Sequence, residues 1–81
     1  MPNRQLSERL NRELDSIGVP PATHERIEIF AKLLHIPRFK AASLLEGLTN
    51  PDERLLQAMA DELEVNADWL LGRSDDKSRE N

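Results

Sequence analysis

Residues 30–47 read FAKLLHIPRFKAASLLEG, and this stretch decides the fold of the 81-residue chain. Apolar residues at three- and four-residue spacing run up to Pro37, which ends the helical pattern because proline disfavours a helical conformation at the preceding Ile36. Proline is well tolerated at the start of a helix, and Gly47 is suited to end the next one. The stretch therefore predicts a helix, a tight turn and a second helix over about residues 38–46.

Helical spacing continues on both sides of this stretch. Gly18 is expected to end a first helix, and Thr23 is a candidate N-cap for the second. Residues 50–52 start a fourth helix, and Asn66 caps a short fifth helix that Gly72 closes. The residues expected to face the core are Leu6, Leu10, Leu14, Ile17, Ile27, Phe30, Ala31, Leu34, Ala41, Leu44, Leu45, Leu55, Leu56, Met59, Ala60, Leu63 and Val65. With no alternating strand pattern, we expect an all-α fold of five helices around one core.

The length and composition predict one domain with two polar ends. We expect residues 1–5 to be a flexible arm, residues 6–72 to form the domain, and residues 73–81 to be a disordered charged tail. The sequence has no cysteine, no apolar run of membrane-spanning length and no apolar stretch of the kind found in signal peptides. These features predict a cytoplasmic protein without disulfides.

Charge is distributed unevenly along the chain, which has a net charge of −4. Residues 24–50 carry four basic and three acidic residues, whereas residues 51–81 carry four basic and nine acidic ones. The mildly basic middle permits nucleic-acid binding. His24 and His35 are separated by about three helical turns and could not share a metal ion, and the sequence has no Gly-rich phosphate loop. We therefore expect neither an enzyme nor a metal or cofactor site.

Three further patterns identify a family. An alanine, a branched residue five positions later and a glycine sixteen positions later are Ala31, Ile36 and Gly47, and they are followed by an Asn-Pro pair and by VNADWLLG at 65–72. Over roughly residues 6–72 this combination resembles the lambdoid repressor–Cro family, also called the Xre family, of helix-turn-helix proteins. The resemblance implies a five-helix, lambda-repressor-like DNA-binding domain.

The resemblance also implies a function. It implies a transcription regulator, such as a repressor, that binds a palindromic operator in double-stranded DNA as a homodimer, with helix 38–46 in the major groove. The implied base contacts are Arg38, Phe39, Ala42 and Ser43, the implied DNA-backbone contacts are Arg26, Lys40, Thr49 and Asn50, and the implied dimer contacts are Trp69 and Leu71. Arg38 has the chemistry to bind guanine through O6 and N7. For Phe39 three environments stay open: the core, a thymine methyl group or a protein partner. For Trp69 the alternatives are the core and a dimer seam.

A second function uses the same scaffold differently. The acidic C-terminal third, the loop at 48–50 without basic residues, and the apolar side chains of Phe39, Ala42 and Leu48 are compatible with a protein partner. The alternative is a protein-interaction module of the antitoxin, adaptor or antirepressor type, with weak or no DNA binding. A continuous positive stripe on the recognition helix would favour DNA, and an apolar patch edged by acids would favour a protein.

Overall fold

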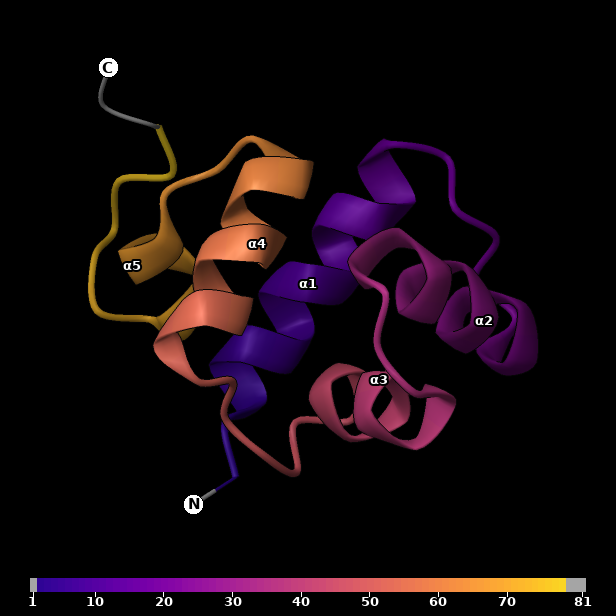
Figure 1. Cartoon of the computed structure of the whole chain (residues 1–81). Coiled ribbons are helices and arrows are strands. Elements are labelled where there is room, and N and C mark those ends of the chain that lie inside the picture. The colour runs from indigo at the N-terminus through magenta and orange to yellow at the C-terminus, as the bar shows by residue number, and fades with distance from the viewer. Residues whose placement is uncertain (1, 79–81) are drawn as a thin grey trace.

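The computed structural model describes residues 2–78, and all regular secondary structure in that range is helical (Figure 1). The helices are α1 (Arg4–Ser16), α2 (Thr23–Leu34), α3 (Arg38–Leu45), α4 (Glu53–Leu63) and α5 (Ala67–Leu71). The prediction of an all-α fold with five helices is confirmed for this part of the chain. None of these helices has the length and apolar character that a membrane span would need.

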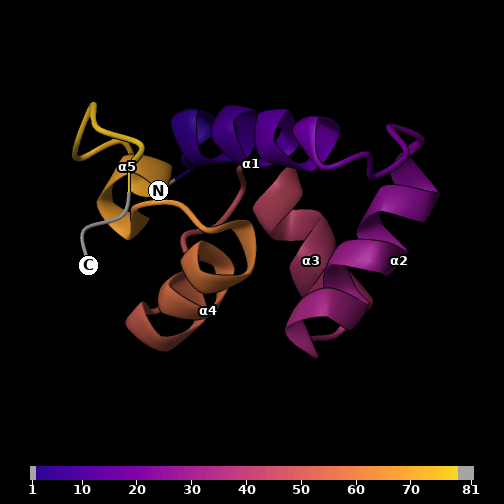
Figure 2. The ribbon, with the colours of Figure 1, turned by 90° about the horizontal axis from the view of Figure 1, so that it is seen from above.

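The helices are arranged around α1. Figure 2 shows α1 along one side of the molecule, with α2, α3 and α4 extending away from it and α5 beside its N-terminal half. Helix α1 packs against α3 and α5, α2 packs against α3 and α4, and α4 packs against α5. These contacts form a closed ring, so each helix buries its apolar side against two others and all five share one core.

The core contains the apolar residues that the helical spacing predicts. Its buried members are Leu6, Leu10, Leu14, Phe30, Ala31, Leu34, Ala41, Leu44, Leu45, Leu55, Leu56, Met59, Ala60, Leu63, Val65, Trp69 and Leu70. Ile27 is half-buried and packs against this cluster. Burial of the repeated apolar side is the main favourable term that holds short helices together, because helices of this length are marginal in isolation.

The prediction for Ile17 is wrong, since 56% of its surface is exposed. Helix α1 ends at Ser16, one residue before Ile17, and Ile17 is its C-cap. Gly18 then adopts a φ of +84°, and the N–H of Val19 donates to the carbonyl of Leu14 at 2.9 Å. This is the hydrogen bond of a Schellman motif. The turn directs Val19 back onto the core and leaves Ile17 outside it.

The prediction that Thr23 caps α2 is also wrong. Thr23 is the first residue of the helix, and the N-cap position is held by Ala22, whose side chain cannot accept a hydrogen bond. The predicted cap at Asn66 and the predicted start of α4 within residues 50–52 are confirmed. The side chain of Asn66 accepts from the N–H of Asp68 at 2.9 Å, and Asp52, within the predicted start of α4, accepts from the N–H of Leu55 at 2.8 Å.

The two polar ends are more ordered than the composition predicts. Helix α1 begins at Arg4, inside the expected flexible arm, and Asn3 caps it while its own N–H donates to the carbonyl of Gly47 at 2.8 Å. Residues 73–78, expected to be disordered, lie against the domain through hydrogen bonds such as that from the N–H of Asn66 to the carbonyl of Lys77, at 3.0 Å. Hydrogen bonds to distant parts of the chain hold both ends, and such bonds cannot be predicted from composition. Met1 and residues 79–81 lie outside the described residues.

Candidate nucleic-acid interface

A three-residue turn joins α2 to α3 and sets the direction of α3. His35 adopts left-handed backbone angles, with a φ of 56° and a ψ of 46°. The N–H of Ile36 then donates to the carbonyl of Ala31 at 3.0 Å, and Ile36 packs against the core. Pro37 is extended and stands at the N-cap position of α3. One apolar anchor and one helix-ending motif therefore fix the angle between the two helices.

One side of α3 is anchored in the core. Ala41, Leu44 and Leu45 are buried, as predicted. The carbonyl of Leu45, at the end of the helix, accepts hydrogen bonds from the hydroxyl of Ser7 and, at 3.1 Å, from the side-chain amide of Asn11. Both donors are on α1. Helix α3 is therefore fixed along its buried side and at its C-terminus, while its N-terminus ends at the surface.

The opposite side of α3 carries the residues implied as base contacts. Arg38 and Phe39 are exposed, and Ala42 and Ser43 are half-buried. Phe39 is 75% exposed, which rules out the core as its environment. Residues three and four positions apart lie on the same side of a helix, so Phe39 is next to both Ala42 and Ser43. Lys40 is exposed at the edge of this surface.

The loop after α3 places Thr49 and Asn50 at the surface. Gly47 adopts a φ of +73°, and the N–H of Leu48 donates to the carbonyl of Ser43 at 2.9 Å. The side chain of Asn50 accepts from the side-chain amide of Asn3 at 3.0 Å, which links the loop to the start of α1. Leu48 is 57% exposed, so the loop presents apolar as well as polar groups beside α3.

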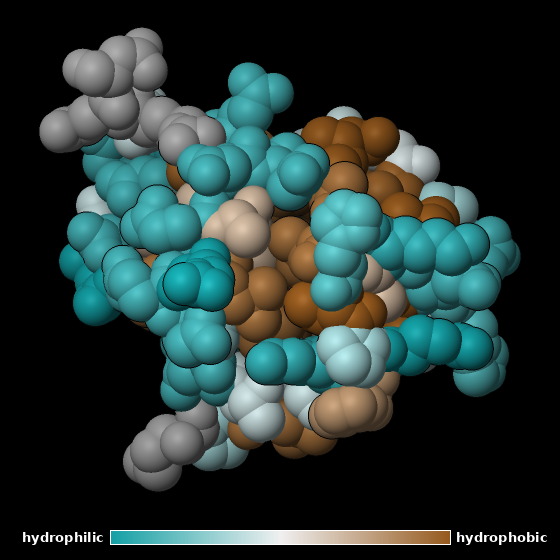
Figure 3. All heavy atoms as spheres, in the orientation of Figure 1, coloured by the Kyte–Doolittle hydropathy of each residue, from teal (hydrophilic) through white to brown (hydrophobic). Residues whose placement is uncertain are grey.

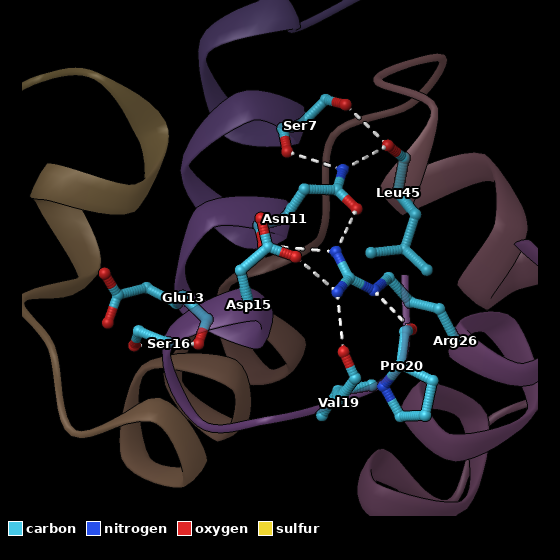
Figure 4. Close-up of polar contacts among 9 residues, drawn as sticks. All are labelled: Ser7, Asn11, Glu13, Asp15, Ser16, Val19, Pro20, Arg26 and Leu45. Carbon is cyan, nitrogen blue, oxygen red and sulfur yellow. Dashed lines mark hydrogen bonds and ion pairs between the residues drawn. The ribbon is translucent and has the colours of Figure 1, made fainter. Parts of the chain in front are cut away.

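The prediction that Arg26 contacts the DNA backbone is wrong. Only 6% of Arg26 is exposed, and its guanidinium group points between α1 and the loop that follows it (Figure 4). It donates to the carbonyls of Pro20 at 3.1 Å, Val19 at 2.8 Å and Asn11 at 3.1 Å. It also donates to the side chain of Asn11 at 3.1 Å and to a carboxylate oxygen of Asp15 at 2.5 Å. With its hydrogen-bonding groups directed inward, this side chain is a structural clamp and cannot reach a phosphate.

The predicted dimer contact at Trp69 also needs correction. Trp69 is 7% exposed and belongs to the core. Two cations lie over its ring: the guanidinium carbon of Arg9 is 4.7 Å from the ring centroid, and the ammonium nitrogen of Lys77 is 5.6 Å from it. Trp69 is therefore covered and is not an exposed anchor in this conformation. Leu71, the other implied dimer contact, is half-buried and packs against the core.

Sequence reasoning missed the two cations that lie over Trp69 and the carboxylate that pairs with one of them. Arg9, Glu13 and Lys77 are ordinary surface types in the sequence, and Lys77 is separated from the other two by more than sixty residues. The carboxylate of Glu13 is nevertheless buried and pairs with Lys77 at 2.7 Å. No local pattern could have predicted this pair, because only the packing of α5 against α1 brings the two ends of the chain together.

The helix N-termini differ in how they are capped. Asn3, Asp52 and Asn66 cap α1, α4 and α5 with side-chain hydrogen bonds. Within residues 2–78, by contrast, no side chain caps α2 or α3. The first N–H groups of these two helices thus remain available as donors.

No protein-family model, no curated protein and no solved structure matches this chain.

Proposed function

We propose that this protein is a sequence-specific regulator that binds double-stranded DNA as a homodimer, with α3 in the major groove. The observation that carries the proposal is the two-sided character of α3. Its buried side holds the helix rigidly on the domain, and its other side presents Arg38, Phe39 and Lys40 at an unobstructed N-terminus. The major groove of B-DNA, about 12 Å wide, admits a single α-helix in this way.

Each side chain on this surface has a distinct role in the proposal. The guanidinium of Arg38 donates two hydrogen bonds to guanine O6 and N7, which discriminates guanine from the other bases. Phe39 contacts a thymine methyl group, and Ser43 donates to or accepts from a base edge. Lys40 neutralises a phosphate, which adds affinity without sequence preference.

The uncapped N-termini of α2 and α3 support contacts with phosphate. The start of a helix combines unpaired N–H donors with the positive end of the helix dipole, and this combination attracts anions. The other three helices use Asn3, Asp52 and Asn66 to satisfy these donors. Phosphate oxygens would take over that role for α2 and α3 when DNA is bound.

A homodimer follows from the small reading surface. One helix reads only a few bases, so a single copy has little selectivity. Two copies related by a two-fold axis read two half-sites about one helical turn, roughly 34 Å, apart on a palindromic operator. A dimer on such a site regulates transcription by blocking access to the promoter.

The experiment is selection from a random duplex library at low and at moderate salt, with Arg38→Ala in parallel. The wild-type chain should enrich a palindrome, and Arg38→Ala should lose about 1–3 kcal/mol of specific binding and relax one base position. The matched control is Arg12→Ala, which removes the same exposed side chain from α1. Equal losses for both variants would contradict the assignment of α3 as the reading helix.

A second variant, Lys40→Ala, separates the affinity for DNA from the recognition of its base sequence. Lys40→Ala should weaken binding to all sequences and reduce the slope of log K against log salt by about 1, while the selected motif stays the same. A changed motif in Lys40→Ala would contradict its role as a phosphate contact.

A protein-interaction module remains the second candidate, because 75% of Phe39 and 57% of Leu48 are exposed. Large exposed apolar side chains are typical of interaction surfaces. This candidate predicts that no motif is enriched at either salt concentration, and that binding to DNA disappears as salt rises.

A further inference from the structure

Helix α1 carries a row of polar side chains beside its buried leucines. Its members, one every fourth residue, are the N-cap Asn3 followed by Ser7, Asn11 and Asp15. Residues four positions apart lie on one side of a helix, and the last three members each directly follow a buried leucine. Every member contacts either α2 or the chain between residues 45 and 50. We call these four residues the polar row.

The polar row caps the C-terminal end of α3. The last four carbonyl groups of a helix have no partner within the helix. In α3, the carbonyls of residues 42–44 accept from the backbone N–H groups of residues 46–48. The carbonyl of Leu45 accepts instead from the hydroxyl of Ser7 and, at 3.1 Å, from the side-chain amide of Asn11. The position of this end of α3 therefore depends on side chains of α1.

The turn that follows α3 is held against the same row. The N–H of Asn3 donates to the carbonyl of Gly47 at 2.8 Å, and the side-chain amide of Asn3 donates to the side chain of Asn50 at 3.0 Å. A Cβ atom at Gly47 would lie 3.0 Å from the carbonyl oxygen of Asn3 and 3.0 Å from the Cβ of Ser7. Helix α1 and this turn are thus in direct contact.

Asn11 joins the end of α3 to α2. Its side-chain amide donates to the carbonyls of Leu45 at 3.1 Å and Ser7 at 2.8 Å. Its side-chain oxygen accepts from the guanidinium group of Arg26 at 3.1 Å, and Figure 4 shows Asn11 between Leu45 and Arg26. Asparagine is a poor residue for the middle of a helix. Its place in α1 is therefore explained by these contacts with α2 and α3.

We propose that Asn11 is a positioning residue for the reading helix, and that its side-chain amide sets the angle at which α3 meets DNA. The proposal rests on the function proposed above and adds a residue on which base recognition depends. Hydrophobic contacts are non-directional, and Figure 3 shows hydrophobic side chains in the middle of the view, where α1 lies between α4 and α3 in Figure 1. Hydrogen bonds, by contrast, have a defined length and direction.

The angle of α3 matters for the proposed contact between Arg38 and guanine. Arg38 is at the N-terminal end of α3, whereas the polar row holds the C-terminal end. A small rotation about the fixed end therefore moves Arg38 sideways in the groove. Binding groups must be held within about 10–20° of their productive geometry, so a rotation of this size is enough to lose the paired hydrogen bonds to O6 and N7.

Two variants change the hydrogen bonds to the carbonyl of Leu45. Asn11→Asp keeps an acceptor for Arg26 but removes the amide donor and places a carboxylate oxygen beside that carbonyl. Ser7→Ala removes the hydroxyl donor without changing the charge. Circular dichroism checks that each variant is folded.

Each variant has a matched control. Gln57→Glu makes the same change from amide to carboxylate at an exposed position of α4. Ser16→Ala removes a hydroxyl from α1 whose hydrogen bond, at 3.1 Å, goes to the carbonyl of Glu13 in the same helix. Neither control alters a contact with α2 or α3.

The first measurement is made without DNA. Residual dipolar couplings of the backbone N–H groups report the angle between α1 and α3, with the angle between α1 and α4 as the internal reference. We expect the α1–α3 angle to change by about 10° or more in Asn11→Asp, and by less in Ser7→Ala. The reference angle and both controls should match the wild type. An unchanged α1–α3 angle in folded Asn11→Asp overturns the proposal.

The second measurement repeats the selection from a duplex library. Asn11→Asp should lower the preference for the base bound by Arg38 by about tenfold, while the slope of log K against log salt stays that of Gln57→Glu, because no cation has been removed. A changed α1–α3 angle with an unchanged base preference also overturns the proposal.

The two measurements separate this proposal from the proposed function. If the wild-type chain selects no operator, the DNA-binding function fails, and the dipolar couplings still decide whether Asn11 positions α3. If Asn11→Asp does not fold, Ser7→Ala decides in its place, and an unchanged α1–α3 angle in that variant overturns the proposal.

Discussion

Replacing Arg26 by alanine should destabilise the domain more than any change on the surface of α3. The variant leaves the carbonyls of Val19 and Pro20 without their donor and removes a second donor from the carbonyl of Asn11, in an interface that is largely closed to water. A buried acceptor without a partner costs about 1–3 kcal/mol, partly recovered as water enters the vacated space. Two such acceptors, together with the lost bonds to Asn11 and Asp15, give an expected loss of about 3–5 kcal/mol.

The loss is large on the scale of the whole domain. At about 0.05–0.15 kcal/mol per residue, a chain of this length has a free energy of unfolding of roughly 4–12 kcal/mol. Arg26→Ala would therefore remove at least a quarter of it. Asp15→Asn, which weakens only the ion pair, should cost about 0.5–1 kcal/mol, because the Asp15 side chain is 62% exposed and its charge is screened by water.

Urea unfolding followed by circular dichroism and by Trp69 fluorescence measures both variants, with coincident transitions as the check on two-state behaviour. The reasoning is refuted if Asp15→Asn destabilises the domain as much as Arg26→Ala, since the ion pair and not the three carbonyls would then account for the effect. A second refutation would be a reduced salt slope of DNA binding in folded Arg26→Ala, because that slope counts phosphate contacts.

Two further changes test the turns and the α3 surface. His35→Gly should raise the free energy of unfolding by about 0.5–1 kcal/mol, because glycine adopts a φ of 56° without the steric cost that a side chain incurs there. Glu46→Gly, at the C-cap of α3 with a φ of −88°, is the matched control and should lower stability in the same urea assay. Phe39→Ala should change the free energy of unfolding by less than about 0.5 kcal/mol while altering the selected operator, and a large loss of stability would show that Phe39 packs inside the domain.

The regular parts of the fold could be predicted because each depends on neighbouring residues. The spacing of Leu6, Leu10 and Leu14 already specifies which side of α1 is buried, and Gly47 and Gly72 mark the ends of α3 and α5 by their conformational freedom. The exposed residues of α3 follow in the same way once its buried side is known. Local patterns are sufficient wherever the interacting residues are a few positions apart.

The inward contacts of Arg26 and the position of residues 73–78 could not be predicted, because their partners are distant and polar. An arginine in an amphipathic helix is expected at the surface, and the burial of Arg26 depends on carbonyls that only the loop after α1 brings together. A run of charged residues is expected to be disordered, and Lys77 is held by Glu13 across most of the chain. In both cases the fold brings polar or charged partners to the buried charge. These partners offset the free-energy cost of removing that charge from water.

The internal role of Arg26 makes pairing of two copies more important for DNA binding. It leaves Lys40 as the one cation of α3 that the proposal assigns to a phosphate, so one copy should show a salt slope of about −1 and two copies a slope of about −2. So few phosphate contacts give a single copy little affinity, and whatever controls pairing then controls DNA binding.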